Sequence, residues 1–241
     1  RLVPFISAAY ILLCGVVLAL RWREVPAAFA SIAAGAFSPR AVTGGALGSA
    51  YQALRVGCSR GVFTNEAGMG STPHAHALAK VKRPQDQGEI AIVSVFIDTF
   101  VVLTLTAMVI LTSGMLNPGA PDGLQGTELA QAAFSASLGT LGGAFVAICM
   151  LFFAFSTIIG WYFFGESNVN ALFKGSKKAT FLYGVIALVF IVVGSFQKVT
   201  LVWDMSDMFN GLMVIPNLLA VLSLSGIVAK FAKDDTYLGK E

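Results

Sequence analysis

Long apolar runs alternate with short polar segments along most of this chain. A run of about 20 apolar residues is long enough to cross a bilayer as a helix. Five stretches meet that description, at residues 4–20, 88–113, 139–165, 179–196 and roughly 203–229. The pattern therefore predicts an all-α polytopic membrane protein with five complete spans.

A sixth apolar region is interrupted by the stretch RGVFTNEAGMGSTPHAHALAK at residues 60–80. We expect residues 49–63 and 69–79 to form the two halves of one broken span, because Gly68 and Gly70 permit non-helical backbone. Irregular backbone at membrane depth is stable only where it lines a cavity or is buried in protein. The break would leave free carbonyls near Phe63 and free amides near Gly68, which suit a zwitterion or a cation with an anion.

The remaining segments complete a single transmembrane domain over residues 1–241. We expect an interfacial helix and a Gly/Ala-rich linker at residues 25–48 and a cytoplasmic tail at residues 230–241. The opening residues RLVP lack the charged region and cleavage site of a signal peptide, so the chain is expected to enter its first span directly, as if cut in a loop.

Composition narrows the class of protein further. Hydrophobic residues make up 56% of the chain and charged residues 12%, about half the charged share of a soluble domain. The net charge of +3 comes from basic residues in short loops, so we expect a lipid bilayer as partner and no nucleic acid. The sequence shows no combination of side chains typical of covalent or acid–base catalysis, no cofactor-binding motif and no pattern that pairs the cysteines. We therefore expect a protein that is not an enzyme.

Basic residues predict the orientation. If the broken segment crosses the membrane once, three clusters of basic residues lie on the same side, as the positive-inside rule requires. Those clusters are Lys80, Lys82 and Arg83, then Lys174, Lys177 and Lys178, then Lys230, Lys233 and Lys240. Three other arginines, Arg21, Arg23 and Arg40, fall on the opposite side and break the rule.

Polar residues inside apolar spans are the candidate functional residues, because an intramembrane polar group is costly. Glu66 is either a structural hydrogen-bonding residue or a substrate ligand, and Asp98 must face protein or water. Ser156 and Thr157 either bond the preceding turn's carbonyls or offer hydroxyl oxygens to an ion.

Other polar residues have simpler interpretations. His74 and His76 are interpreted as packing or helix-end residues, and a zinc hydrolase built on them with Glu66 is a remote alternative. Asp204, Asp207 and Asn210 are expected to cap the last span or to shape an external vestibule, and capping is favoured.

The interrupted stretch, with RPQDQGEIAIVSVFIDTFVVLTLTAMVILTSG after it, resembles the sodium:alanine symporter family, also called the alanine-or-glycine:cation symporters. The later stretches AFSTIIGWYFFGE and VWDMSDMFNGLMVIPNLLAVLSLSGIV resemble the same family's closing helices. The resemblance covers nearly the whole chain, but only as the family's C-terminal half. The family's glycine-rich first broken helix, with its TALAATVGTGNIAG-like motif, is absent from these residues.

This resemblance implies a leucine-transporter-type fold of two inverted repeats, each opening with a broken helix. Residues 1–20 would be the last helix of the first repeat and residues 49–229 the second repeat. The implied function is sodium-coupled symport of a small neutral amino acid, alanine or glycine, across the cell membrane. A missing N-terminal half would then be the partner that completes the site.

The resemblance also implies a site. The substrate would meet Phe63, Thr64, Asn65, Glu66 and Gly68, with backbone carbonyls holding its ammonium group. Sodium, the coupling ion and the only expected metal, would take oxygens from Thr64, Asn65, Ser156 and Thr157. The alternatives are a proton-coupled transporter of the same fold, with Glu66 or Asp98 carrying the proton, and an inactive fragment.

Overall fold

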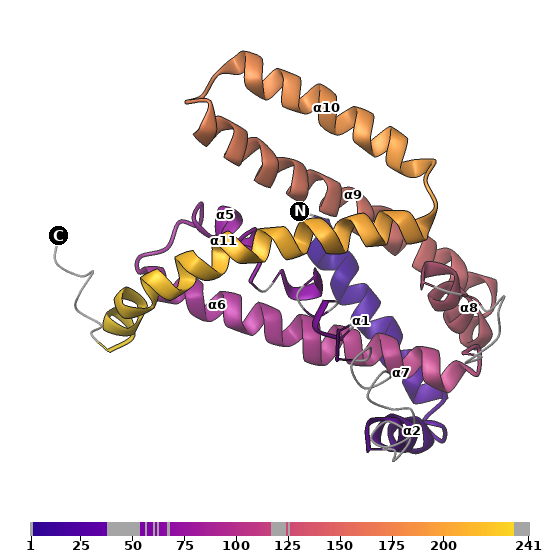
Figure 1. The fold of residues 1–241 in the computed structure, drawn as a ribbon. Helices are drawn as coiled ribbons and strands as arrows, with labels where there is room; N and C mark the ends of the chain where they lie inside the picture. The colour runs from indigo at the N-terminus through magenta and orange to yellow at the C-terminus, as the bar shows by residue number, and fades with distance from the viewer. Residues whose placement is uncertain are drawn as a thin grey trace. The chain divides into compact units, whose positions relative to one another are not determined.

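The chain folds into helices joined by turns and irregular segments (Figure 1). The computed structural model describes residues 2–37, 54–55, 57–59, 61, 63–66, 68–116, 124 and 126–233, and these contain no β-strand. The named elements are α1 (Val3–Leu20), α2 (Val25–Phe37), α5 (Thr72–His76), α6 (Pro84–Phe96), the π-helix η1 (Ile97–Val102), α7 (Leu103–Ser113), α8 (Gly126–Leu138), α9 (Thr140–Leu172), α10 (Lys177–Ser195) and α11 (Val199–Lys233). The expected all-α class is confirmed.

Five helical stretches of the described chain have the length and composition of membrane spans. They are Val3–Leu20, Pro84–Ser113, Thr140–Leu172, Lys177–Ser195 and Val199–Phe231. Each of the five predicted spans thus corresponds to a helix long and apolar enough to cross a membrane, although several helices extend beyond their predicted ends. Hydropathy marks only the apolar centre of a helix, whereas backbone hydrogen bonding continues into its polar flanks.

Helical backbone continues without a break from α6 through the π-helical segment η1 into α7, over Pro84–Ser113. A π-helix has one extra residue per turn and is often found at functional sites. Asp98 and Thr99, the polar pair of this span, lie within it. The sequence predicted the span but not this local widening.

The chain divides into two compact units, which are described separately. Unit 1 comprises Arg1–Gln52 and Phe96–Ile159, and unit 2 comprises Ala53–Val95 and Gly160–Glu241. The core of unit 1 is formed by the fully buried side chains Cys14, Val17, Val109, Ala133, Phe134 and Val146. Tyr10 packs at its edge, with its ring 5.7 Å from that of Phe134 and its hydroxyl 2.9 Å from Thr106 Oγ1.

Two glycines of α9 allow close packing in unit 1. A Cβ placed on Gly142 would overlap the backbone carbonyl of Phe134, and one on Gly143 would overlap the Ser135 hydroxyl. Both contacts belong to α8, so the absence of side chains at these positions lets α8 lie directly against the start of α9. Close helix approach at small residues is common in membrane proteins.

Arg21 joins the ends of three helices in unit 1. Its Nε donates to Ser137 Oγ at 2.6 Å, its Nη1 to the Thr112 carbonyl at 2.8 Å and its Nη2 to the Ala136 carbonyl at 2.9 Å. A cation is favourable beside the C-terminal carbonyls of helices, and α7 and α8 both end here. These contacts give a structural reason for an arginine that breaks the predicted charge rule.

Unit 2 contains α5, α6, α10, α11 and the second part of α9. Helices α9 and α10 form an antiparallel hairpin, in which the rings of Tyr162 and Tyr183 lie 5.3 Å apart. The Tyr183 hydroxyl lies over Gly165 and donates to the Tyr162 carbonyl at 3.3 Å.

Two elements differ from the sequence expectation. Helix α8 was not predicted, because its 13 residues are too short and too polar for the hydropathy pattern of a span. The capping role favoured for Asp204, Asp207 and Asn210 is wrong, because α11 begins earlier, at Val199. These three residues therefore lie inside the helix, beyond its first turn.

Several predicted segments fall partly outside the described residues. A helix is present in the expected segment as α2, and its interfacial position stays a prediction. The linker at residues 38–48 lies outside the described part of the chain. The same is true of residues 234–241 of the expected tail and of much of the first half of the broken span.

Candidate functional site

The helix is interrupted between Glu66 and Ser71, where the sequence predicts a break. Residues 63–65 are helical, whereas Glu66, Gly68 and Gly70 all have positive φ, at 51°, 83° and 78°. A positive φ is unusual for a non-glycine residue and costs about 1–3 kcal/mol. The chain therefore holds Glu66 in a conformation that its surroundings must maintain.

The second half of the broken span is shorter than predicted. Helix α5 comprises only Thr72–His76 rather than residues 69–79, with a proline in its first turn. The two left-handed glycines delay the start of the helix, and Pro73 suits an N-terminal position because its missing N–H would be unbonded there anyway. A helix of five residues has a small dipole, so the expected positive helix end is weak.

The Glu66 side chain spans this break. Its Oε2 accepts hydrogen bonds from Ser71 Oγ at 2.6 Å and from Thr72 Oγ1 at 3.2 Å. Ser71 is 2% exposed and Glu66 is half-buried. One carboxylate oxygen thus connects the first residue of the break to the start of α5.

Gly70 touches α11 at the break. A Cβ on Gly70 would lie 2.8 Å from Asn217 Oδ1 and 3.1 Å from its Cγ. A side chain at this position would force Asn217 to move, and only glycine adopts φ of 78° without strain. The sequence identified Gly70 as permissive backbone but gave no signal for its partner, Asn217.

The two histidines have polar partners on neighbouring helices. His74 Nδ1 lies 3.0 Å from the Ser71 carbonyl oxygen, which it reaches as a donor, and its Nε2 lies 3.4 Å from Asn168 Oδ1 on α9. His76 Nδ1 accepts from Gln87 Nε2 on α6 at 2.6 Å. Among the described residues, no three His, Cys, Asp or Glu side chains gather as metal ligands do.

The other substrate candidates lie before the break or within it. Phe63 is half-buried, with its ring 5.3 Å from that of Trp203 on α11 in an edge-to-face contact. Asn65 is half-buried, whereas Thr64 and Gly68 are exposed. Unit 2 therefore holds the predicted substrate residues Phe63, Thr64, Asn65, Glu66 and Gly68 together in one short segment.

A cavity of about 560 Å³ borders the break in unit 2. Its polar lining includes Ser71, His74, Asn168 and Asn217, with Gly70 among the backbone positions. The cavity lies beside the C-terminal side of the break, and residues 63–66 are not part of its lining.

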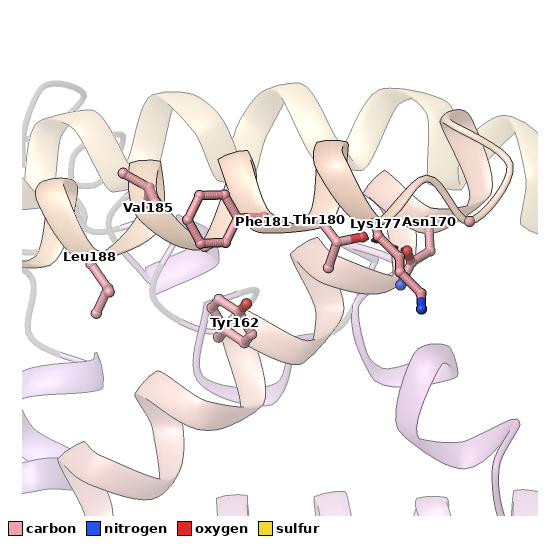
Figure 2. A pocket seen from close by; sticks show the side chains of 9 residues that line it. Tyr162, Asn170, Lys177, Thr180, Phe181, Val185 and Leu188 are labelled. Atoms are coloured by element: carbon pink, nitrogen blue, oxygen red, sulfur yellow. Dashed lines mark hydrogen bonds between the residues drawn. The ribbon is translucent and has the colours of Figure 1, made fainter.

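A larger cavity, of about 720 Å³, lies between the end of α9 and α10 (Figure 2). Tyr162 and apolar side chains of α10 line one part of it, and Asn170, Lys177 and Thr180 gather at the other end, where Thr180 Oγ1 donates to Asn170 Oδ1 at 2.7 Å. None of the candidate site residues lines this cavity. Because it is mostly apolar and remote from the break in sequence, we do not assign it to the site.

The predicted sodium residues of α9 lie in unit 1. Ser156 Oγ donates to the Phe153 carbonyl at 2.9 Å, the bond to the preceding turn that is common in membrane helices. Thr157 is exposed. Ser156 has used its donor, but the lone pairs of its oxygen remain available to a cation.

Comparisons with known proteins place these features in a family. The family described as "Sodium:alanine symporter family" matches residues 1–240. The chain is 44% identical over 213 residues to "Probable sodium/glutamine symporter GlnT" of Bacillus subtilis, covering 88% of this chain and 43% of that protein. It is 39% identical over 233 residues to "Sodium/alanine symporter AgcS" of Methanococcus maripaludis, covering 96% and 50%. It is 37% identical over 233 residues to "Amino-acid carrier protein AlsT" of Bacillus subtilis, covering 97% and 48%.

The chain thus spans about half the length of the curated relatives that it matches. The family match over residues 1–240 does not itself support the expected missing N-terminal half. The expected membership of a multi-pass membrane transporter family is confirmed by the match and by the five apolar helices.

Proposed function

Because the chain belongs to the sodium:alanine symporter family, we propose that its protein is a sodium-coupled symporter of a small neutral amino acid in the cell membrane. The family match over residues 1–240 is the observation that carries this proposal. The relatives are about twice as long as the chain, so the activity is proposed for the whole protein.

The proposed substrate site is the segment from Phe63 to Gly68. Helical backbone ends at residue 65 and resumes at Thr72, and at this end the Phe63 carbonyl accepts a hydrogen bond from the Glu66 amide at 3.3 Å in a turn. A carbonyl oxygen has two lone pairs, so it can accept a second donor. Such carbonyls suit the ammonium group of an amino acid, and Thr64 and Asn65 add side-chain oxygens. Interrupted helices of this kind form the midplane sites of secondary transporters.

The proposed sodium ligands are the oxygens of Thr64, Asn65, Ser156 and Thr157. Hydroxyl and carbonyl oxygens are the ligands that hard cations prefer. The hydrogen bond from Ser156 to Phe153 leaves the hydroxyl oxygen able to accept a cation. No other metal or cofactor is proposed, and the family's role in transport favours a protein that is not an enzyme.

Alanine or glycine is the proposed substrate, and glutamine is the second candidate. The first is favoured by the relative named as a sodium/alanine symporter, and the second by the relative named as a probable sodium/glutamine symporter. Uptake of labelled alanine, glycine and glutamine, each measured separately, distinguishes the two. Accumulation of glutamine without accumulation of alanine or glycine would favour the second candidate.

The decisive experiment measures uptake of labelled alanine by the whole protein in proteoliposomes. An inward sodium gradient is expected to drive accumulation, and replacing sodium with potassium is expected to abolish it. Equal uptake in the two cations would refute sodium coupling. If a proton gradient alone drove uptake, the proton-coupled alternative with Glu66 or Asp98 would replace it.

A further inference from the structure

The carboxylate of Glu66 links the two sides of the break through hydrogen bonds. Two hydroxyl groups, from Ser71 and Thr72, converge on its Oε2 at 2.6 and 3.2 Å. Ser71 is almost fully buried, so its hydroxyl needs a protein partner, and Glu66 is the acceptor that it uses. Hydrogen bonds to a charged acceptor are the stronger kind.

The backbone at Glu66 needs this support. Its φ of 51° is left-handed, although it is not a glycine. Its amide donates to the Phe63 carbonyl at 3.3 Å, and its own carbonyl accepts from the Met69 amide at 3.3 Å. These two bonds are long, whereas the bond from Ser71 is short. The hydrogen bond from Ser71 to the Glu66 side chain is therefore the shortest of the three, and it joins residues on the two sides of the break.

We infer that Glu66 is a positioning residue, whose carboxylate fixes the non-helical backbone at Glu66 and at residues 68–71 and thereby presents Thr64 and Asn65. It acts through Ser71 and Thr72 and is not itself a ligand of substrate or sodium. This inference rests on the proposed function, because positioning is meaningful only if the segment binds a transported solute. The test separates this positioning role from direct contact between a solute and the second carboxylate oxygen, Oε1.

The test compares four variants of the whole protein in proteoliposomes, by the KM for alanine, the maximal rate and the half-saturating sodium concentration. Glu66→Gln keeps an acceptor oxygen for both hydroxyls, so its KM should stay within about threefold of the original. Glu66→Leu removes the acceptor and should raise KM about tenfold or more. Ser71→Ala and Thr72→Val each remove one donor and should raise KM by smaller factors, with the maximal rate little changed.

Two further observations distinguish positioning from general damage. Ser71→Ala should add little to the KM of Glu66→Leu, because both remove the same interaction. Half-saturating sodium and the pH profile of uptake should be unchanged in Glu66→Gln. Glu89→Gln, which changes an exposed carboxylate on α6, is the matched control and should leave every parameter unchanged.

The inference is overturned if Glu66→Gln shifts the sodium dependence or the pH profile while Ser71→Ala and Thr72→Val do not. That result would make Glu66 a direct ligand or a proton carrier. Additive effects of Ser71→Ala and Glu66→Leu would overturn it too. If Glu66→Leu fails to insert in the membrane, the Ser71 and Thr72 variants still decide.

Hydrogen exchange of backbone amides tests the positioning role of Glu66 independently of the proposed transport function. Backbone amides of residues 66–76 should exchange faster in Ser71→Ala and Thr72→Val than in the unsubstituted protein, whatever the solute or coupling ion. Unchanged exchange would refute the positioning role. Sodium-independent uptake with faster exchange would refute only the proposed coupling.

Discussion

At the scale of single residues, the interrupted segment is defined by side chains that hold a strained backbone in place. Glu66 bonds two hydroxyls across the break, and Gly70 makes room for Asn217. Gly68 shares the positive φ of Gly70, but a Cβ added to Gly68 would meet no described atom within 4 Å beyond its chain neighbours. A substitution at Gly68 therefore tests backbone strain alone, whereas a substitution at Gly70 tests strain together with a steric clash.

Substituting these two glycines should have unequal effects. Gly68→Ala forces only an unfavourable φ, which costs about 1–2 kcal/mol for an alanine. Gly70→Ala carries the same strain and also places its Cβ 2.8 Å from Asn217 Oδ1, so we expect a larger loss of alanine uptake and of thermal stability in detergent.

The control for the Gly70→Ala variant removes the Asn217 side chain, which the added methyl group would meet. Asn217→Ala combined with Gly70→Ala should restore part of the stability that Gly70→Ala loses. Equal effects of the two single substitutions, with no recovery in the double variant, would contradict the close approach of Gly70 to α11.

At the scale of elements, the membrane helices are set by their length and apolar composition, but their packing is set by small residues. Gly142 faces the backbone of α8 at the start of α9. Gly160, farther along the same helix, has no described atom within 4 Å of its Cβ position apart from its chain neighbours and the nearby backbone of its own helix. The described contacts thus show close packing at Gly142 and none at Gly160.

This difference predicts opposite outcomes for two substitutions on one helix. Gly142→Ala should lower the thermal stability of the protein in detergent, because its methyl would overlap the Phe134 carbonyl. Gly160→Ala should leave stability unchanged or raise it by up to about 1 kcal/mol, since alanine favours helix more than glycine does. A Gly160→Ala variant as unstable as Gly142→Ala would indicate a further packing contact at Gly160.

At the scale of the whole molecule, the chain matches about half of each curated relative and contains one interrupted helix within its described residues. Transport is proposed for a whole protein about twice as long as this chain, so residues 1–241 are only part of what is proposed to transport.

We therefore expect residues 1–241, expressed alone, not to accumulate labelled alanine under a sodium gradient. The measurement is uptake into proteoliposomes that contain only these residues, with empty vesicles as the lower reference and the whole protein as the upper one. Sodium-dependent accumulation above the empty vesicles would show that residues 1–241 hold a complete site.

The sequence alone determined the membrane class, the five spans and the place of the break, because hydropathy and glycine conformational freedom are local properties that neighbouring residues reveal. It did not determine α8, whose short polar sequence gives no span signal, nor the start of α11 before Asp204.

Only the tertiary structure decided which groups meet. Arg21 binds Ser137, which lies 116 residues away, and Gly70 lies against Asn217. Glu66 could be interpreted from sequence as ligand or as structural residue, and its two hydroxyl donors became known only from the path of the chain between residues 66 and 72. Such partners depend on how the backbone folds back on itself, which no local pattern specifies.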